Sequence, residues 1–343
     1  MTALTTPARP QHDASPRPVP WRRMAWVTWR QHRIALAGVA ALLSAWAVYL
    51  WLTGLHLHHA YAAVTACRPA NSIACGEIIS EFNLTYGDRA LAASVLLQAV
   101  PALIGAFAGA PVLARELETG TFRYAWTQGI GRWRWALAKL VPLAIAVAAA
   151  AGVFSLLFSW FYQPFSADGN STPFTPELFG LRGVAFAAWT LAAFAIGALA
   201  GMLIRRVVPA IAATLAVYAG LALAAGLYLR QHYAAPLLTS NPNVPGSAWI
   251  MSQWWTKAGR FAFTNWHDAP AGLIQRLCPN PSAGKGTPGT LQQCLAQHGY
   301  TQWTSYQPGS RFWPFQWIEG GWLLALSLLL IAATVWLVRR RAA

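Results

Sequence analysis

Residues 91–114 read LAASVLLQAVPALIGAFAGAPVLA, and residues 115–139 follow as RELETGTFRYAWTQGIGRWRWALAK. The first segment contains no Lys, Arg, Asp or Glu, whereas the second contains five basic and two acidic residues. A helix of about 20 apolar residues matches the ~30 Å thickness of the hydrocarbon core of a bilayer. The two segments therefore indicate a membrane-spanning helix that ends at a basic segment in water.

Five further segments share the length and apolar character of 91–114. They are 34–55, 140–161, 184–204, 207–229 and 317–338, and none of them contains Lys, Arg or Asp. One arginine at mid-bilayer opposes insertion by roughly 3 kcal/mol, which would cancel about six leucines. Only 10% of the 343 residues are charged, against about 25% in soluble domains. The sequence therefore predicts an all-α integral membrane protein whose domain of six transmembrane helices spans residues 34–343.

The net charge of +15 has two explanations, membrane topology and binding to nucleic acid. Segments 1–33, 115–139, 205–206 and 339–341 hold 16 basic and 3 acidic residues, whereas the rest of the chain holds 9 and 7. Basic residues concentrate on the cytoplasmic flanks of membrane helices. The alternation favours a multi-pass protein of the bacterial plasma membrane with both termini in the cytoplasm, and it argues against a nucleic-acid partner.

Two short segments precede the first helix. Residues 1–20 are rich in Pro, Thr, Ser and Ala without an apolar period, which predicts a disordered cytoplasmic tail. Residues 21–33, WRRMAWVTWRQHR, place Trp21 and Trp29 on one helical face and four arginines on another. This pattern predicts an amphipathic elbow helix on the inner leaflet. The alternative is a basic flank continuous with the first helix, which we interpret as an uncleaved signal anchor.

All four cysteines lie in connections assigned to the outside: Cys67, Cys75, Cys278 and Cys294. Disulfides persist outside the cytoplasm, and four cysteines allow three pairings. We predict the local pairs Cys67–Cys75 and Cys278–Cys294, with free thiols as the alternative. The spacing fits no common zinc motif, so we expect no metal site there.

Three connections are assigned to the outside. Segments 56–90 and 163–182 are predicted loops, and the histidines near position 56 suit an interfacial run better than a metal site because no acidic or Cys partner lies at ligand spacing. The large extracellular loop 230–316 is rich in aromatic residues. Its apolar pieces, such as 248–255, are too short to cross the membrane, so we predict interfacial or re-entrant helices.

The second apolar segment contains residues that disturb a helix and residues that let helices approach closely. Pro101 and Pro111 each remove a backbone hydrogen bond, which predicts a kinked helix. Gly105 and Gly109 are four residues apart, a spacing that permits close contact between membrane helices. The fourth segment repeats this spacing at 197 and 201, although chance in an Ala-rich sequence is an alternative explanation.

The helices offer almost no catalytic chemistry. There is no HExxH motif and no paired carboxylate, and Gly284-Lys285-Gly286 lacks the Ser or Thr that a phosphate-binding loop requires. We therefore expect no enzyme activity and no cofactor in this chain. Glu319 is the exception among the apolar segments, near the outer end of the last one. It is predicted either to extend toward water or to shape an exit or gate.

Segment 115–139 carries a recognisable series of residues. Glu116 and Glu118 are followed by Gly120-Thr121, then by Gly131-Arg132 and Lys139. This series resembles the membrane subunits of type-2 ATP-binding-cassette (ABC) exporters, although Gly129 stands where that family often has Pro. Segments 26–33 and 306–319 resemble ABC transporter permeases common in actinobacteria.

The resemblance implies that segment 115–139 is a coupling element that docks on a separate ABC ATPase subunit. The residues implied in this contact or its turns are Glu116, Glu118, Gly120, Thr121, Arg123, Gly131 and Arg132. For Glu116 and Arg123, charges in a solvated loop are the alternative. ATP and Mg would bind the partner ATPase, and a second membrane subunit would complete a dimer, expected to be a homodimer, with a path lined by the second and fifth helices.

The sequence thus predicts the transmembrane permease subunit of an ATP-driven exporter, moving a hydrophobic or amphipathic substrate across the lipid bilayer. The substrate class follows from helices that offer almost no charge. The alternative is a non-transporting sensor or scaffold whose Trp-rich extracellular loop binds a lipid or a peptide.

Overall fold

The computed structural model describes residues 21–68, 72–121, 131–167, 172–241, 243–270, 272–278 and 288–341. The predicted tail 1–20, Arg123 and Gly284-Lys285-Gly286 lie outside these residues. Six helices are long and apolar enough to cross a membrane: Leu36–Ala66, Ile73–Thr119, Arg132–Ala167, Gly183–Ile204, Val207–His232 and Gly309–Arg340. Their number and order confirm the predicted spans, and the described chain is mostly helical.

The first two helices form a hairpin that is longer than predicted. α1 (Trp21–Ala66) and α2 (Ile73–Leu97) continue well beyond the apolar segments, so the prediction of a loop over 56–90 was wrong. The rings of Tyr61 and Phe82 lie 5.7 Å apart across the hairpin, so the polar ends of both helices still pack on each other. Cys67 and Cys75 form the predicted disulfide at the tip.

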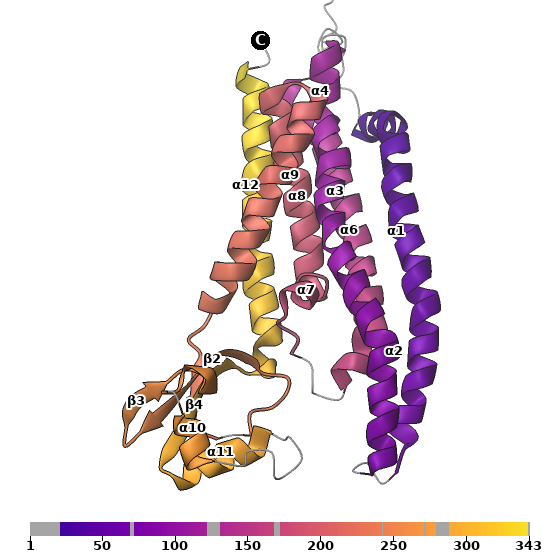
Figure 1. Ribbon diagram of the computed structural model, residues 1–343. Coiled ribbons are helices and arrows are strands. Elements are labelled where there is room, and N and C mark those ends of the chain that lie inside the picture. The colour runs from indigo at the N-terminus through magenta and orange to yellow at the C-terminus, as the bar shows by residue number, and fades with distance from the viewer. Residues whose placement is uncertain are drawn as a thin grey trace, which may run out of the picture.

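The N-terminal residues of the described chain belong to α1 without interruption. Residues 21–33 are helical and continuous with the span that follows. In Figure 1 the first turns of α1 lie at an angle to the rest of the helix. The amphipathic elbow at the membrane surface therefore stays a prediction, because the helix alone does not distinguish it from a basic flank.

The second span is divided, as its prolines predict. α2 ends at Leu97, α3 (Ala99–Ile104) follows, a π-helical turn η1 (Gly105–Gly109) comes next, and α4 (Ala110–Thr119) completes the span. Pro101 and Pro111 cannot donate to the carbonyls four residues before them. The interruption at Gln98 lies between Pro101 and the carbonyl that it leaves without a donor, and the π-helical turn ends two residues before Pro111. π-Helical turns are a common cause of kinks.

The centre of the bundle is α8 (Gly183–Ile204). It packs against α4 and η1, against α6 (Arg132–Ala167), against α9 (Val207–Ala224) and against α12 (Phe312–Arg341). Arg205 has a φ of 58° and ends α8 in the left-handed conformation, so α9 begins two residues later as the predicted antiparallel hairpin. α9 continues into a π-helical turn η2 (Ala225–Leu229) and a 3₁₀ turn η3 (Arg230–His232).

The two small-residue motifs face each other across α8 and the second span. A Cβ atom on Gly197 would lie 2.3 Å from the Gly105 carbonyl oxygen, and one on Gly109 would lie 2.6 Å from the Phe194 carbonyl oxygen. Only glycine permits this backbone contact. The spacing is therefore a packing motif rather than a consequence of composition.

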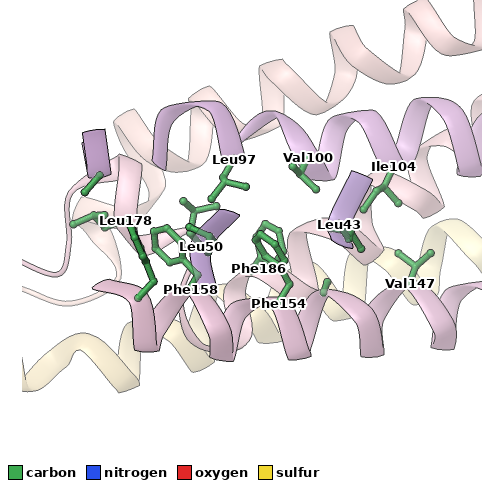
Figure 2. Packing of buried hydrophobic residues seen from close by; sticks show 14 of the residues in the cluster. Leu43, Leu50, Leu97, Val100, Ile104, Val147, Phe154, Phe158, Leu178 and Phe186 are labelled. Atoms are coloured by element: carbon green, nitrogen blue, oxygen red, sulfur yellow. The ribbon is translucent and has the colours of Figure 1, made fainter. Parts of the chain in front are cut away.

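The apolar core of the bundle links α1, α2, α3, α6 and α8. Leu50, Leu97, Phe158 and Phe186 are fully buried in it, as Figure 2 shows at close range. By contrast, α9 leaves Val208, Val217 and Leu223 exposed, and η2 leaves Leu227 exposed. Soluble monomeric proteins rarely expose a continuous apolar surface of this kind, so this face is suited to lipid or to a second subunit.

The connection 230–316 folds as a β-sheet with short helices, which corrects the prediction of interfacial or re-entrant helices. Strands β1 (Leu237–Thr239), β2 (Trp249–Lys257), β3 (Arg260–Phe263) and β4 (Tyr300–Gln307) form an antiparallel sheet in the order β1-β4-β2-β3. Segment 248–255 is mainly strand, and its aromatic and β-branched residues Trp249, Ile250 and Trp254 suit a half-buried strand. Trp254 pairs with Trp303 across β2 and β4.

A small core of its own supports this sheet. Trp255, Phe263, Leu295 and Tyr300 are buried together beneath the helices α10 (Leu273–Leu277) and α11 (Pro288–Gln297). The second predicted disulfide, Cys278–Cys294, joins these helices. Short turns η4 (Trp266–Asp268) and η5 (Gly309–Arg311) complete the region. Figure 1 shows the sheet and the tip of the α1–α2 hairpin at the end of the bundle opposite the C-terminus.

Candidate functional site

A cavity of about 190 Å³ lies between the second span, α9–η2 and α7 (Pro176–Phe179). Its walls are mostly apolar and include Pro101, Phe186, Tyr218 and Leu223. Gln98, where α2 and α3 separate, and Gly226 in the π-helical turn of η2 also line it. Departures from regular α-helix on both sides thus coincide with the cavity.

Arg230 in the cavity lining belongs to a buried ion pair. The Arg230 guanidinium binds the Glu319 carboxylate with two nitrogens, Nε to Oε2 at 3.0 Å and Nη2 to Oε1 at 2.9 Å. Glu319 is 0% exposed and Arg230 is 4% exposed. A buried charge is tolerated when it is paired and its remaining acceptor sites are satisfied. The expectation that Glu319 extends toward water was therefore wrong.

Two aromatic side chains complete the environment of Glu319. Trp189 Nε1 donates to Oε1 at 2.8 Å, and the Tyr233 hydroxyl donates to Oε2 at 3.1 Å. Trp322 Nε1 in turn donates to the Tyr233 hydroxyl at 2.9 Å. Burial raises the pKa of Tyr233, and Glu319 raises it further, so the phenol keeps the proton that it donates. The carboxylate thereby joins α12 to α8 and to the end of the fifth span.

Gln316 makes a second polar link one turn away on α12. Its Oε1 accepts from the Ala185 backbone N–H at 2.9 Å, and its Nε2 donates to the Phe179 carbonyl at 2.9 Å. The Arg230 guanidinium carbon lies 4.1 Å from the centre of the Phe179 ring, which is within cation–π distance. The N-terminal ends of α8 and α12, together with η3, are therefore fixed around α7.

The other end of the bundle carries the predicted coupling residues. Glu116 at the end of α4 pairs with Lys139 in α6, and their side chains are 14% and 5% exposed. The Lys139 ammonium also lies 4.6 Å from the centre of the Trp135 ring. Glu116 thus has a partner within this chain, and its contact with an ATPase stays a prediction.

Glu118 makes a different contact from the same helix end. Its Oε2 accepts from the backbone N–H of Val207 at 3.0 Å, so it satisfies one of the free N–H groups at the start of α9. The described part of the coupling element therefore brings together the ends of α4, α6 and α9. These two contacts link the end of α4 with the first turns of α6 and α9.

The remaining coupling positions lie at the turns on each side of the gap 122–130. Gly120 has a φ of 71° and ends α4 in the left-handed conformation that favours glycine. Thr121 is exposed, with its hydroxyl 3.1 Å from that of Thr119. Gly131 is exposed and its carbonyl accepts from the Trp135 N–H at 3.0 Å, while Arg132 begins α6.

Sequence reasoning singled out Glu319 but missed its partners Arg230, Trp189 and Tyr233. The sequence did contain a signal for the pairing of Glu319 with Arg230. Arg230 directly follows the fifth apolar segment, and Glu319 lies near the start of the sixth. Opposite charges at the same side of the membrane on two spans could have been considered as a pair.

Part of the chain matches a known protein family. A protein-family model described as "ABC-2 membrane transporter related" matches residues 40–230, which extend from α1 to Arg230. No curated protein and no solved structure matches the chain. The matched residues include Gln98, Trp189 and Tyr218 of the cavity and both coupling glutamates.

Proposed function

Because the chain belongs to the ABC-2 membrane transporter related family, we propose that it is the permease subunit of an ATP-driven exporter. The exporter moves a hydrophobic or amphipathic substrate. The observation that carries this substrate class is the apolar cavity between the second and fifth spans. Arg230, the one charged residue among the described residues that line it, is neutralised by Glu319. A strongly charged substrate would find no opposite net charge there.

The driving force comes from a separate ATPase subunit that binds ATP and Mg. Among the described residues, the end of α4 is joined to α6 through Glu116 and Lys139, and to α9 through Glu118. A push on this end by a closing ATPase would move the second span together with the starts of the third and fifth. Of these, the second and fifth spans line the cavity. This chain supplies the path and no catalytic step.

The proposed orientation places the α4 end and both termini in the cytoplasm of a bacterium, with the sheet outside the plasma membrane. Support comes from the basic residues at the α4 end and from the two disulfides at the opposite end. Disulfides persist outside the reducing cytoplasm. We further propose a homodimer, because the exposed apolar face of α9 lies next to the cavity.

The proposal is tested by purifying the tagged chain from its native membrane in a mild detergent that preserves complexes. We expect an ATP-hydrolysing subunit to co-purify, identified by mass spectrometry and by ATPase activity sensitive to removal of Mg. A chain that co-purifies with no ATPase, under conditions that keep other membrane complexes intact, contradicts the proposal. That outcome would favour the non-transporting sensor or scaffold.

A further inference from the structure

Buried polar atoms without a hydrogen-bond partner gather around the short helix α7. Within the described part of the chain they are Thr175 Oγ1, Arg182 Nε and Arg230 Nη1. Thr175 precedes α7, Arg182 follows it by three residues, and Arg230 stacks on Phe179 of α7. Buried polar groups in proteins are nearly always hydrogen-bonded, so three exceptions around one turn mark this place for a polar ligand.

Arg230 is the member of this group that lines the cavity. Its Nε and Nη2 are occupied by Glu319, and the Phe179 ring lies against the guanidinium. These contacts hold the planar group in one position, so Nη1 is a pre-oriented donor that lacks an acceptor. Nη1 is itself buried, so an acceptor on a molecule in the cavity would reach it after a small movement of the side chains that cover it, with the ion pair kept intact.

The charge balance indicates which acceptor fits. Glu319 already neutralises Arg230, and the carboxylate is itself buried beside the guanidinium. An anionic ligand would lose its hydration and would meet a paired cation, which is unfavourable in a low-dielectric site. A neutral oxygen, such as a carbonyl or an ether, accepts from Nη1 without this cost.

The size of the cavity limits the part of the ligand that enters. An engineered protein cavity of about 150 Å³ holds one benzene molecule, and this one measures about 190 Å³. It therefore accommodates one ring or a segment of similar size, against the apolar side chains of Pro101, Leu223 and Leu227.

We infer that this cavity binds a neutral amphipathic molecule, with a carbonyl or ether oxygen accepting a hydrogen bond from Arg230 Nη1 and an apolar ring or chain against α3 and α9–η2. The identification of this molecule with the exported substrate rests on the proposed function. The binding itself does not require an ATPase, so the two proposals fail separately.

The experiment uses the purified full-length chain in lipid nanodiscs and benzophenone as the probe, because this aromatic ketone has a neutral acceptor and is photoreactive. Peptides labelled on illumination are identified by mass spectrometry. We expect saturable labelling of buried cavity residues such as Phe186 and Tyr218, and non-saturable labelling of Leu328 and Leu329, which are exposed on α12.

Small molecules that compete with benzophenone then measure what the hydrogen bond contributes to binding. Acetophenone and ethylbenzene have similar shapes, but only the former carries a carbonyl. We expect acetophenone to displace the saturable labelling at about tenfold lower concentration, because a hydrogen bond to a charged donor exceeds one to a neutral donor. Benzoate, which is anionic, should displace it less well than acetophenone.

Two variants of the site connect this difference with Arg230. Arg230→Lys keeps a cation for Glu319 but removes the free guanidinium nitrogen, so the advantage of acetophenone over ethylbenzene should disappear. Arg260→Lys, on the exposed end of β3, is the matched control and should keep the full advantage. If Arg230→Lys does not fold, the double variant Arg230→Met, Glu319→Gln removes both charges and should show the same loss.

Three outcomes would overturn the inference. The first is the absence of saturable labelling in the cavity, and the second is equal displacement by acetophenone and ethylbenzene in the unmodified chain. The third is an acetophenone advantage that persists in whichever Arg230 variant folds. Displacement by benzoate at a lower concentration than acetophenone would refute the neutral character of the ligand.

Discussion

The two ends of the bundle each contain an ion pair, but the pairs are built differently. At the end near the sheet, Arg230 binds Glu319 with two nitrogens, and two aromatic donors satisfy the same carboxylate. At the α4 end, the Lys139 ammonium binds a single oxygen of Glu116, whose side chain is 14% exposed. The planar guanidinium fork holds its partner in one geometry, whereas the ammonium is a point charge on a flexible stem.

The difference indicates which end is fixed and which end moves. Separating Arg230 from Glu319 would leave a carboxylate with no exposed surface and no countercharge among the described residues. Separating Lys139 from Glu116 breaks one contact next to water. The proposed exporter would need this arrangement, because the end that meets the ATPase must change its contacts while the opposite end keeps the cavity in shape.

Glu319→Ala should have the largest effect. It leaves Arg230 buried without its partner, and breaking a buried ion pair in this way costs about 3–5 kcal/mol. The measurement is thermal unfolding of the purified chain in detergent. Arg230→Met combined with Glu319→Gln should recover much of the loss because no charge is left unpaired. Equal stability of Glu319→Ala and the unmodified chain would remove the distinction between the two ends.

Gly197→Ala should have an intermediate effect on the contact that lies between the two ends. The added Cβ would lie 2.3 Å from the Gly105 carbonyl oxygen and 2.7 Å from the Ala110 nitrogen. Overpacking of this kind costs about 1–3 kcal/mol. Gly220→Ala is the matched control, since its Cβ would meet nothing within 4 Å. If both substitutions change the unfolding temperature equally, the close contact between α8 and the second span is wrong.

Glu116→Ala should change stability least and coupling most. The pair is partly exposed and has one contact, so we expect a loss of about 1–2 kcal/mol, between the values for surface and buried pairs. The ATPase activity of the complex purified with its ATPase subunit should nevertheless fall, because the ion pair no longer transmits movement from α4 to α6. Full ATPase activity together with a large loss of stability would reverse the roles assigned to the two ends.

Hydropathy predicted the spans correctly because insertion depends on apolar length, which is a local property of the chain. It did not predict where the helices end. Glu77, Glu81 and Asp88 terminate the apolar run, yet α2 begins at Ile73 because the hairpin partner and the Cys67–Cys75 disulfide support the helix outside the apolar segment. Local cysteine spacing was sufficient for both disulfide pairs.

The sheet and the outer ion pair were harder to predict for a different reason. Residues 300–307, YTQWTSYQ, alternate only weakly, and β4 obtains its register from β1 and β2, which are remote in sequence. Aromatic content was taken as a sign of the membrane interface, whereas Trp255 and Tyr300 belong to a buried core. Arg230 and Glu319 are 89 residues apart, so their contact depends on tertiary structure.

The proposed function requires that the end of the bundle carrying Glu116 meets a cytoplasmic ATPase. Photo-cross-linking in cells tests this contact, with p-benzoylphenylalanine incorporated at Thr121 or, as the matched control, at Arg260; both residues are exposed, at opposite ends of the molecule. We expect an adduct with an ATP-hydrolysing subunit from position 121 and none from position 260. No such adduct from position 121, or an adduct from position 260, would contradict it.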